Sequence, residues 1–168
     1  MEFQRSCGDC QYNFGGFCTA KGFGQPAEGE TVPCQLWEIS EEALARAVEA
    51  APWYLKKPYE MGKTSLSAFL EDLERDAQGL PVEIGIFDAI EQVYGYSQRE
   101  LARILGVSSD VVGYAKAHGA VARRIPHFSR CLHIPEELFR HFTTADLPLL
   151  EQCRVAYETQ LKKPEASE

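Results

Sequence analysis

Apolar residues recur with the spacing of an α-helix through most of this 168-residue chain, and strand-like alternation is nearly absent. The periodic stretches predict helices over residues 40–50, 65–78, 84–94, 98–105, 109–117, 126–132, 135–142 and 146–161. Residues 51–63 contain Pro52, Pro58 and Gly62, a composition that predicts a linker. We therefore expect a mainly α fold, and no internal repeat indicates an array.

The first 38 residues break this pattern, because they are rich in glycine and aromatic residues and show no helical or strand period. They contain four of the six cysteines, Cys7, Cys10, Cys18 and Cys34, with the spacing C-x2-C-x7-C-x15-C. Cys7 and Cys10 on one tight loop can direct two thiolates at the same ion or cluster, and the longer loops can return two more. A segment with so little regular structure is expected to depend on a bound metal for its stability.

The spacing of the cysteines bears on which metal they would hold. Structural zinc sites usually combine two C-x2-C pairs, whereas this array has one pair followed by two separate cysteines among aromatic residues. It resembles small high-potential-type iron–sulfur modules, in which an apolar shell shields the cluster from water. The resemblance implies a [4Fe–4S] cluster; Zn²⁺ is the alternative, and a segment with no metal or with a redox disulfide is the third interpretation.

The chain carries a formal net charge of -8, but the charge is unevenly distributed. Between Ser97 and Arg130 six basic residues accompany only two acidic ones, which gives that segment a charge of +4. A basic face on an otherwise acidic protein is typical of a nucleic-acid contact surface, although a solvated face has the same composition. No apolar run approaches the roughly 20 residues of a membrane helix, and the first residues lack an export signal, so we expect a cytoplasmic protein.

Residues 97–116 have the pattern of two short helices that meet at a sharp angle. Ala102 is small where the helices must cross closely, and Gly106 lies where the turn requires a positive φ. Ser108 or Ser109 is expected to cap the second helix, with Asp110 in its first turn. Residue size, backbone freedom and capping therefore agree on a helix-turn-helix.

This stretch resembles the helix-turn-helix of the phage-repressor-like family (lambda repressor and Cro, XRE-type), and the resemblance extends over about residues 82–142. It implies a DNA-binding bundle in which the start of the first helix contacts a phosphate and the second helix faces the major groove. The predicted DNA contacts, including basic residues for the backbone, are Gln98, Arg99, Ser108, Ser109, Tyr114, Lys116, Arg123 and Arg124. The sequence departs from the pattern at Gly113 and Ala117, which offer no side-chain hydrogen bond, so direct base readout would be thin.

These observations divide the chain into four parts: a cysteine-rich metal-binding module (1–38), a two-helix linker region (39–80), a helix-turn-helix domain (81–145) and a C-terminal helix with its tail (146–168). They predict a DNA-binding transcriptional regulator of prokaryotic or phage type with a redox- or iron-responsive metal centre. No catalytic grouping emerges, so we do not expect an enzyme. The alternatives are an adaptor or assembly protein that uses the helix-turn-helix for protein contacts, and an electron-transfer accessory protein. The C-terminal helix is the candidate surface for a homodimer, because such readers usually engage two half-sites.

Overall fold

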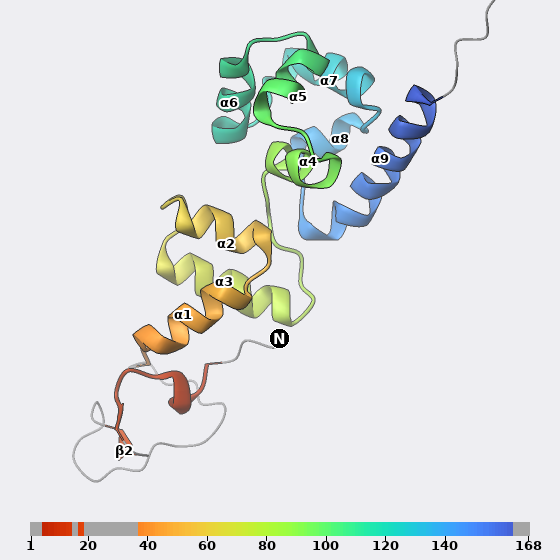
Figure 1. Cartoon of the computed structure of the whole chain (residues 1–168). Helices are drawn as coiled ribbons and strands as arrows, with labels where there is room; N and C mark the ends of the chain where they lie inside the picture. The colour runs from red at the N-terminus through yellow and green to blue at the C-terminus, as the bar shows by residue number, and fades with distance from the viewer. Residues whose placement is uncertain (1–4, 15–16, 19–36, 163–168) are drawn as a thin grey trace, which may run out of the picture. The chain divides into compact units, whose positions relative to one another are not determined.

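The computed structural model describes residues 5–14, 17–18 and 37–162. The chain divides into two compact units, Met1–Leu80 and Pro81–Glu168, each with its own packing. Helices make up nearly all the regular structure of the described residues, which confirms the predicted mainly α fold class (Figure 1). Within these ranges, every helix is too short or too polar to cross a lipid bilayer.

The first unit begins with short elements. The 3-10 turn η1 (Cys7–Asp9) is followed by the strands β1 (Asn13–Phe14) and β2 (Phe17–Cys18). The strands are antiparallel, and Asn13 lies opposite Cys18. Two-residue strands are too short to produce a period of alternating side chains, so no sequence pattern predicts them.

Two helices of this unit confirm the predicted ranges, and each follows a serine that caps it. Helix α1 (Glu41–Ala50) follows Ser40, whose Oγ accepts a hydrogen bond from the Ala43 N–H (3.2 Å). Helix α3 (Leu66–Ala77) follows Ser65, whose Oγ accepts from the Ala68 N–H at the same distance. In each case the hydroxyl satisfies one of the amide groups that the first helical turn leaves without a partner.

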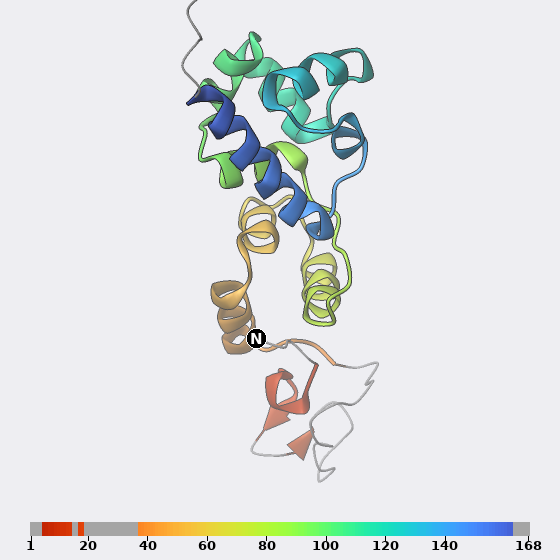
Figure 2. The ribbon, with the colours of Figure 1, turned by 90° about the vertical axis from the view of Figure 1, so that its right-hand side faces the viewer.

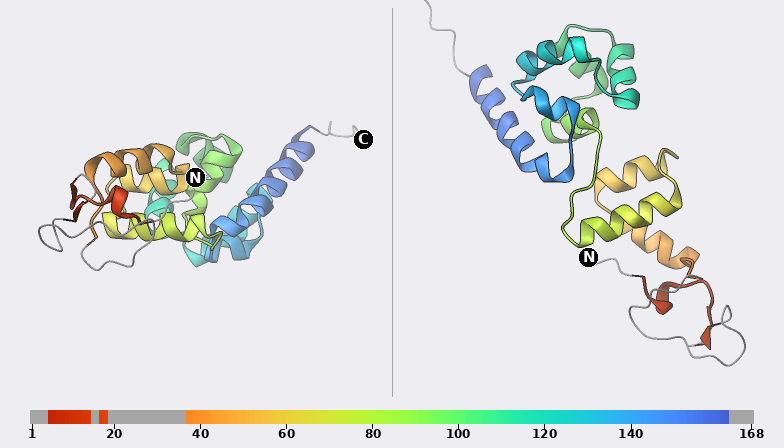
Figure 3. Two further views of the ribbon diagram at one scale, coloured as in Figure 1. Left: turned by 90° about the horizontal axis from the view of Figure 1, so that it is seen from below. Right: turned by 180° about the vertical axis from the view of Figure 1, so that it is seen from behind.

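The predicted linker over residues 51–63 is wrong, because α2 (Trp53–Glu60) forms there and includes Pro58 in its last turn. Contacts with α3 stabilise this helix by more than Pro58 destabilises it. The Leu55 side chain is buried, the Tyr59 ring stacks on Phe69 at 4.4 Å between centroids, and the Tyr54 hydroxyl donates to Asp76 Oδ1 (2.7 Å). Figure 3 shows α2 and α3 packed side by side. Pro58 removes one amide donor from the helix, a smaller loss than the burial gained along this face.

The named elements of the second unit are all helices. They are α4 (Ile86–Tyr94), α5 (Gln98–Leu105), α6 (Ser109–His118), η2 (Ala122–Arg124), α7 (Ile125–Leu132), α8 (Glu136–Arg140), η3 (Thr144–Asp146) and α9 (Leu147–Leu161). The predicted helices agree with these bounds to within two residues at each end, and the bounds of α5 agree completely. An antiparallel bridge between Glu83 and Thr143 joins the chain before α4 to the chain before α9.

The core of the second unit forms where these helices cross. Helix α4 packs on α6 and α9, while α7 packs on α5, α8 and α9. The rings of Phe87, Phe128 and Phe139 contact one another, with centroids 5.8 to 6.2 Å apart. Leu101 and Leu105 on α5 are fully buried beside them. Burial of this many large apolar side chains is the main stabilising contribution to the unit.

Helix α9 lies across one side of this core (Figure 2). It contributes the buried side chains of Leu150, Cys153 and Tyr157. The Tyr157 ring packs 5.8 Å from the ring of Tyr94, whose hydroxyl donates to the Leu132 carbonyl (3.3 Å). Burial raises the pKa of the Cys153 thiol and the pKa of Tyr94. Cys153 is therefore a buried thiol of the core, whereas Cys131 is half-buried.

Candidate functional site

Helices α5 and α6 are joined by a three-residue turn, and local hydrogen bonds fix both ends of α5. The Ser97 Oγ accepts from the Glu100 N–H (3.3 Å), and Glu100 Oε2 accepts from the Ser97 N–H (2.7 Å). This hydrogen bond from Ser97 lowers the pKa of the Glu100 carboxyl. At the other end Gly106 has φ of 64°, and Val107 donates to the Ala102 carbonyl (3.0 Å). The predicted positive φ at Gly106 is confirmed, and it turns the chain sharply into α6.

The side chain of Gln98 ties the start of α5 to the start of α6. Its Nε2 donates to the Ser109 carbonyl (2.8 Å) and lies 3.1 Å from the Ser109 Oγ. A Cβ atom added at Gly113 would lie 3.1 Å from the same Nε2, so the absence of a side chain at Gly113 makes room for Gln98. Two predicted DNA contacts, Gln98 and Ser109, are therefore bonded to each other.

The structure places Lys116 on the inner side of α6, where it contacts α4. Its Nζ lies 2.7 Å from Glu91 Oε2 and 3.6 Å from Asp88 Oδ1, and its side chain is 17% exposed. Burial lowers the pKa of Lys116, but the hydrogen bond to Glu91 and the two negative charges outweigh burial and raise it above its ordinary value. The prediction that Lys116 contacts the DNA backbone does not fit this position, because its charge is already paired.

The outer face of α6 carries short polar groups and one large ring. Ser108, Asp110 and Ala117 are exposed, and the Tyr114 side chain is 57% exposed, with its ring 4.7 Å from that of His118. Ser108 occupies the N-cap position, but its side chain makes no capping hydrogen bond. This face therefore offers hydroxyl groups and a ring, without a guanidinium or amide group for bidentate base contacts.

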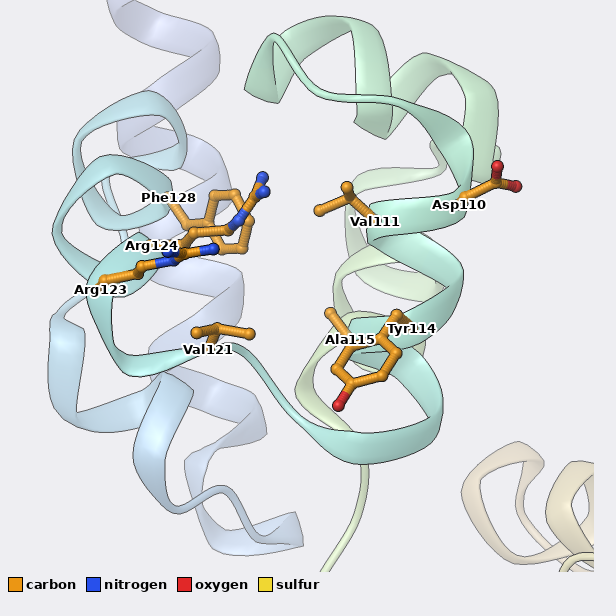
Figure 4. Close-up of a pocket in the computed structure, with 8 residues that line it drawn as sticks. All are labelled: Asp110, Val111, Tyr114, Ala115, Val121, Arg123, Arg124 and Phe128. Atoms are coloured by element: carbon orange, nitrogen blue, oxygen red, sulfur yellow. The ribbon is translucent and has the colours of Figure 1, made fainter.

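The basic residues Arg123 and Arg124 follow α6 and lie across a pocket from it (Figure 4). Neither they nor Arg99 form a salt bridge with another residue of the described ranges. The structure thus brings Tyr114, Arg123 and Arg124 around one pocket, while Arg99 stands exposed at the start of α5. The pocket is lined by groups that are ten residues apart in sequence, so no local sequence motif predicts it.

The described part of the cysteine segment is held by backbone contacts with residues 37–40. Gln11 donates to the Glu38 carbonyl and Ser40 to the Asp9 carbonyl, both at 2.8 Å, and Cys10 forms an antiparallel bridge with Ile39. The Trp37 indole donates to the Ser6 carbonyl (2.8 Å), and the Arg5 guanidinium lies 5.2 Å from the centre of the Trp37 ring. Chain from both ends of the cysteine array therefore meets in one place.

Three predicted metal ligands lie in this segment. The Asn13 amide donates to the Cys7 carbonyl (2.8 Å), and its backbone donates to the Cys10 carbonyl (3.1 Å) and pairs with Cys18 across the strands. Cys7, Cys10 and Cys18 are half-buried. Across residues 5–14, 17–18 and 37–162, no three His, Cys, Asp or Glu side chains are grouped to hold a metal ion. The fourth predicted ligand, Cys34, lies outside the described residues.

The sequence did not reveal one contact between a cysteine and a histidine. On α7 the Cys131 Sγ lies 3.6 Å from His127 Nε2, and that nitrogen lies 2.7 Å from the Leu105 carbonyl. The signal was the four-residue spacing, which places both side chains on one helical face. The hydrogen bond to Leu105 identifies His127 as a link between α5 and α7.

Comparison of the chain with protein-family models, with curated proteins and with solved structures finds no match.

Proposed function

We propose that this chain is a cytoplasmic DNA-binding transcriptional regulator of prokaryotic or phage type, with α5 and α6 as its helix-turn-helix. The observation that carries the proposal is the exposed face of α6, flanked by Arg123 and Arg124 with no salt bridge to any described residue. The tight turn at Gly106 presents α6 at a fixed angle to α5, as a helix that enters a groove requires.

The charges around α6 favour contact with the DNA backbone over direct base readout. Arg123 and Arg124 supply guanidinium groups that suit phosphate oxygens, whereas the Asp110 carboxylate repels phosphate oxygens. The outer face of α6 leaves Ser108 and Tyr114 for base contacts, since Lys116 is paired with α4. We therefore expect specificity to depend largely on the shape of the duplex.

The test is fluorescence anisotropy with a pool of labelled genomic duplexes, measured over a range of salt concentrations. The double variant Arg123→Gln, Arg124→Gln should bind more weakly, and the slope of log K against log salt should fall by about two, because each phosphate contact contributes about one. Arg140→Gln is the matched control, since Arg140 lies on α8 and pairs with Glu136 (3.4 Å). The absence of binding to any duplex at low salt would overturn the proposal.

The proposal includes a metal centre held by Cys7, Cys10, Cys18 and Cys34, with a [4Fe–4S] cluster as the first candidate and Zn²⁺ as the second. It is supported by the hydrogen bonds that draw Cys7, Cys10 and Cys18 into one segment. Cys34 precedes Trp37 by three residues, and three residues of extended chain span about 10 Å, so a fourth thiolate is within reach. Thiolate ligands suit both metals, and the aromatic residues of the segment suit a shielded cluster.

Metal analysis of anaerobically purified protein distinguishes these candidates. A cluster predicts a coloured sample with about four iron and four sulfide per chain, and zinc predicts a colourless sample with about one zinc. Cys10→Ser should abolish either signal, whereas Cys153→Ser, at the buried thiol of α9, should leave it unchanged. Wild-type protein with neither metal would overturn this part of the proposal while leaving the DNA-binding part to its own test.

An adaptor function is the second candidate, and the outer face of α6 favours it. Tyr114 is 57% exposed there, and tyrosine is enriched in protein interfaces. If α6 binds a protein, Tyr114→Ala should weaken that complex, and the affinity should depend little on salt. A DNA reader shows the opposite behaviour, since its affinity falls steeply as salt rises.

A homodimer through α9 completes the proposal. Leu149 and Val155 are exposed on this helix, off the face that covers the core, and Leu161 is exposed at its C-terminal end. Exposed apolar side chains on a single helix are typical of a surface that pairs with a partner. Sedimentation of wild type and of the double variant Leu149→Glu, Val155→Glu tests this, and a wild-type monomer at micromolar concentration would exclude the dimer.

A further inference from the structure

The pocket beside α6 has an apolar floor and a charged edge (Figure 4). Its volume is about 230 Å³, and it separates α6 from η2 and the start of α7. The apolar lining is provided by Val111 and Ala115 from α6, by Val121 from the connection, and by Phe128 from α7. Ala115 and Phe128 are buried beneath it, whereas Val121 is 42% exposed at its rim.

The edge of the pocket is positively charged. Figure 4 shows the nitrogen atoms of Arg123 and Arg124 turned toward the gap, and the Asp110 carboxylate turned away from it. No salt bridge joins either arginine to a described residue. Two adjacent guanidinium groups repel each other, and an anion placed between them would be attracted by both.

We infer that this pocket binds a small organic anion, with one carboxylate and one apolar ring. The carboxylate would accept charge-assisted hydrogen bonds from Arg123 and Arg124, in the geometry for which guanidinium groups are suited. The ring would cover Val111 and Val121 and remove their apolar surface from water. The volume lies below the roughly 300 Å³ at which sites for drug-sized molecules begin, so it limits the ligand to about one ring.

Other occupants match only part of the lining. Inorganic phosphate would satisfy the arginines but leave the apolar floor in contact with water. A neutral aromatic molecule would cover the floor but place an uncharged group beside two guanidinium groups. Only a ligand with both features uses all of the pocket, and this requirement makes the inference testable with simple probes.

Calorimetric titration of the full chain, without DNA, compares three probes. Benzoate has both features, benzyl alcohol retains the ring without the charge, and inorganic phosphate has charge without the ring. We expect benzoate to bind about tenfold more tightly than either of the other two probes. Benzyl alcohol loses the charge-assisted hydrogen bonds, and phosphate loses the contacts of the ring. Absence of benzoate saturation, or equal affinity for benzyl alcohol or phosphate, would overturn the inference.

Variants then place the binding at this pocket. Arg124→Gln should weaken benzoate binding about tenfold, and Val121→Trp should weaken it similarly by filling the space from an exposed position that tolerates a larger side chain. Arg130→Gln is the control, because Arg130 is exposed on α7 and does not line the pocket. Circular dichroism verifies that each variant is folded. Unchanged affinity in the folded Arg124 and Val121 variants would refute this location.

The consequence for regulation rests on the proposed function. If Arg123 and Arg124 bind DNA phosphates, bound benzoate uses the same guanidinium groups, and benzoate and DNA exclude each other. Benzoate should then lower the apparent DNA affinity of the wild type and have no effect on DNA binding by Val121→Trp. If the protein binds benzoate but no duplex, the pocket inference holds and the proposed function fails. If it binds a duplex but no benzoate, the proposed function holds and the pocket inference fails.

Discussion

The cysteine segment and the helical unit Pro81–Glu168 are stabilised in different ways. In the described part of the segment η1 buries no residue, and contacts such as Gln11 with Glu38 and Trp37 with Ser6 are hydrogen bonds. In the helical unit Phe87 and Phe128 are each 1% exposed and pack ring against ring. Apolar burial grows with the number of residues that share one core, so a short segment obtains less of it, here the burial of Trp37.

This contrast indicates which part of the chain can fold by itself. The helical unit contains enough buried apolar surface to offset the conformational entropy lost when it folds. The cysteine segment has a few hydrogen bonds, each of which contributes about 1 kcal/mol. It therefore requires another source of stability, which a metal held by thiolates would supply.

For the proposed metal-bound protein, metal removal is expected to have the largest effect and to act on one side of this contrast. Chelation, or Cys10→Ser, should abolish the hydrogen-exchange protection of residues 5–14, because structural zinc contributes on the order of 10 kcal/mol to comparable small modules. The amides of α4 to α9 should retain their protection. Exchange measured by mass spectrometry resolves both regions, and loss of protection in the helical unit would contradict the contrast.

The second prediction disrupts the helical unit. Phe128→Ala removes a ring that contacts both Phe87 and Phe139, and it should lower the free energy of unfolding by about 3–5 kcal/mol. Urea denaturation followed by circular dichroism measures this change. Val121→Ala is the matched control because Val121 is exposed nearby, and its effect should remain within about 0.5 kcal/mol. Equal effects of the two substitutions would show that burial does not dominate here.

The third prediction concerns the polar link between α6 and α4. Lys116→Met removes the cation that lies 2.7 Å from the half-buried Glu91 carboxylate, and it should cost about 1–2 kcal/mol, between the values for exposed and buried pairs. Arg140→Met, which removes the exposed pair with Glu136, should cost about 0.5 kcal/mol or less. Urea denaturation at pH 7 measures both, and an Arg140 variant that loses more would reverse the argument.

The pH dependence of the Lys116 link has a definite sign. Folding raises the pKa of Lys116 above its ordinary value of 10.5, so the folded state binds this proton more tightly than the unfolded state does. The contribution is fully present below pH 10.5 and is lost as the pH rises through the folded-state pKa. The stability difference between wild type and Lys116→Met should therefore shrink above pH 10.5. The raised pKa of Tyr94 affects both proteins equally and cancels in the difference.

The fold was predictable where local signals and packing agree. The apolar spacing of residues 98–105 and Gly106 after them predict both ends of α5, and the structure has these bounds and the positive φ at Gly106. Helix α2 was not predictable in this way, because Pro58 argues against a helix and only contacts with α3, such as Tyr59 on Phe69, override it. Such contacts depend on residues far apart in the sequence.

The candidate site was predictable in part for the same reason. Lys116 follows Val112 by four residues, so it shares the inner face of α6, and this spacing could have excluded it as a DNA contact. Its partners Asp88 and Glu91 lie on another helix and had no local signal. The pocket that joins α6 to Arg123 likewise arises from tertiary packing alone.

The smallest expected effect on stability is that of Gly113→Ala, which makes two opposing contributions. Alanine there should stabilise α6 by about 1 kcal/mol through helix propensity, but its Cβ would lie 3.1 Å from Gln98 Nε2 and displace that side chain from Ser109. Loss of that bond costs about 1 kcal/mol, so Gly113→Ala alone should change stability little. With Gln98→Ala already present the bond is absent, and Gly113→Ala should then stabilise by about 1 kcal/mol. This double-mutant cycle, measured by urea denaturation, isolates the polar link. Equal effects of Gly113→Ala in both backgrounds would mean that Gln98 contributes nothing and that burial alone joins α5 to α6.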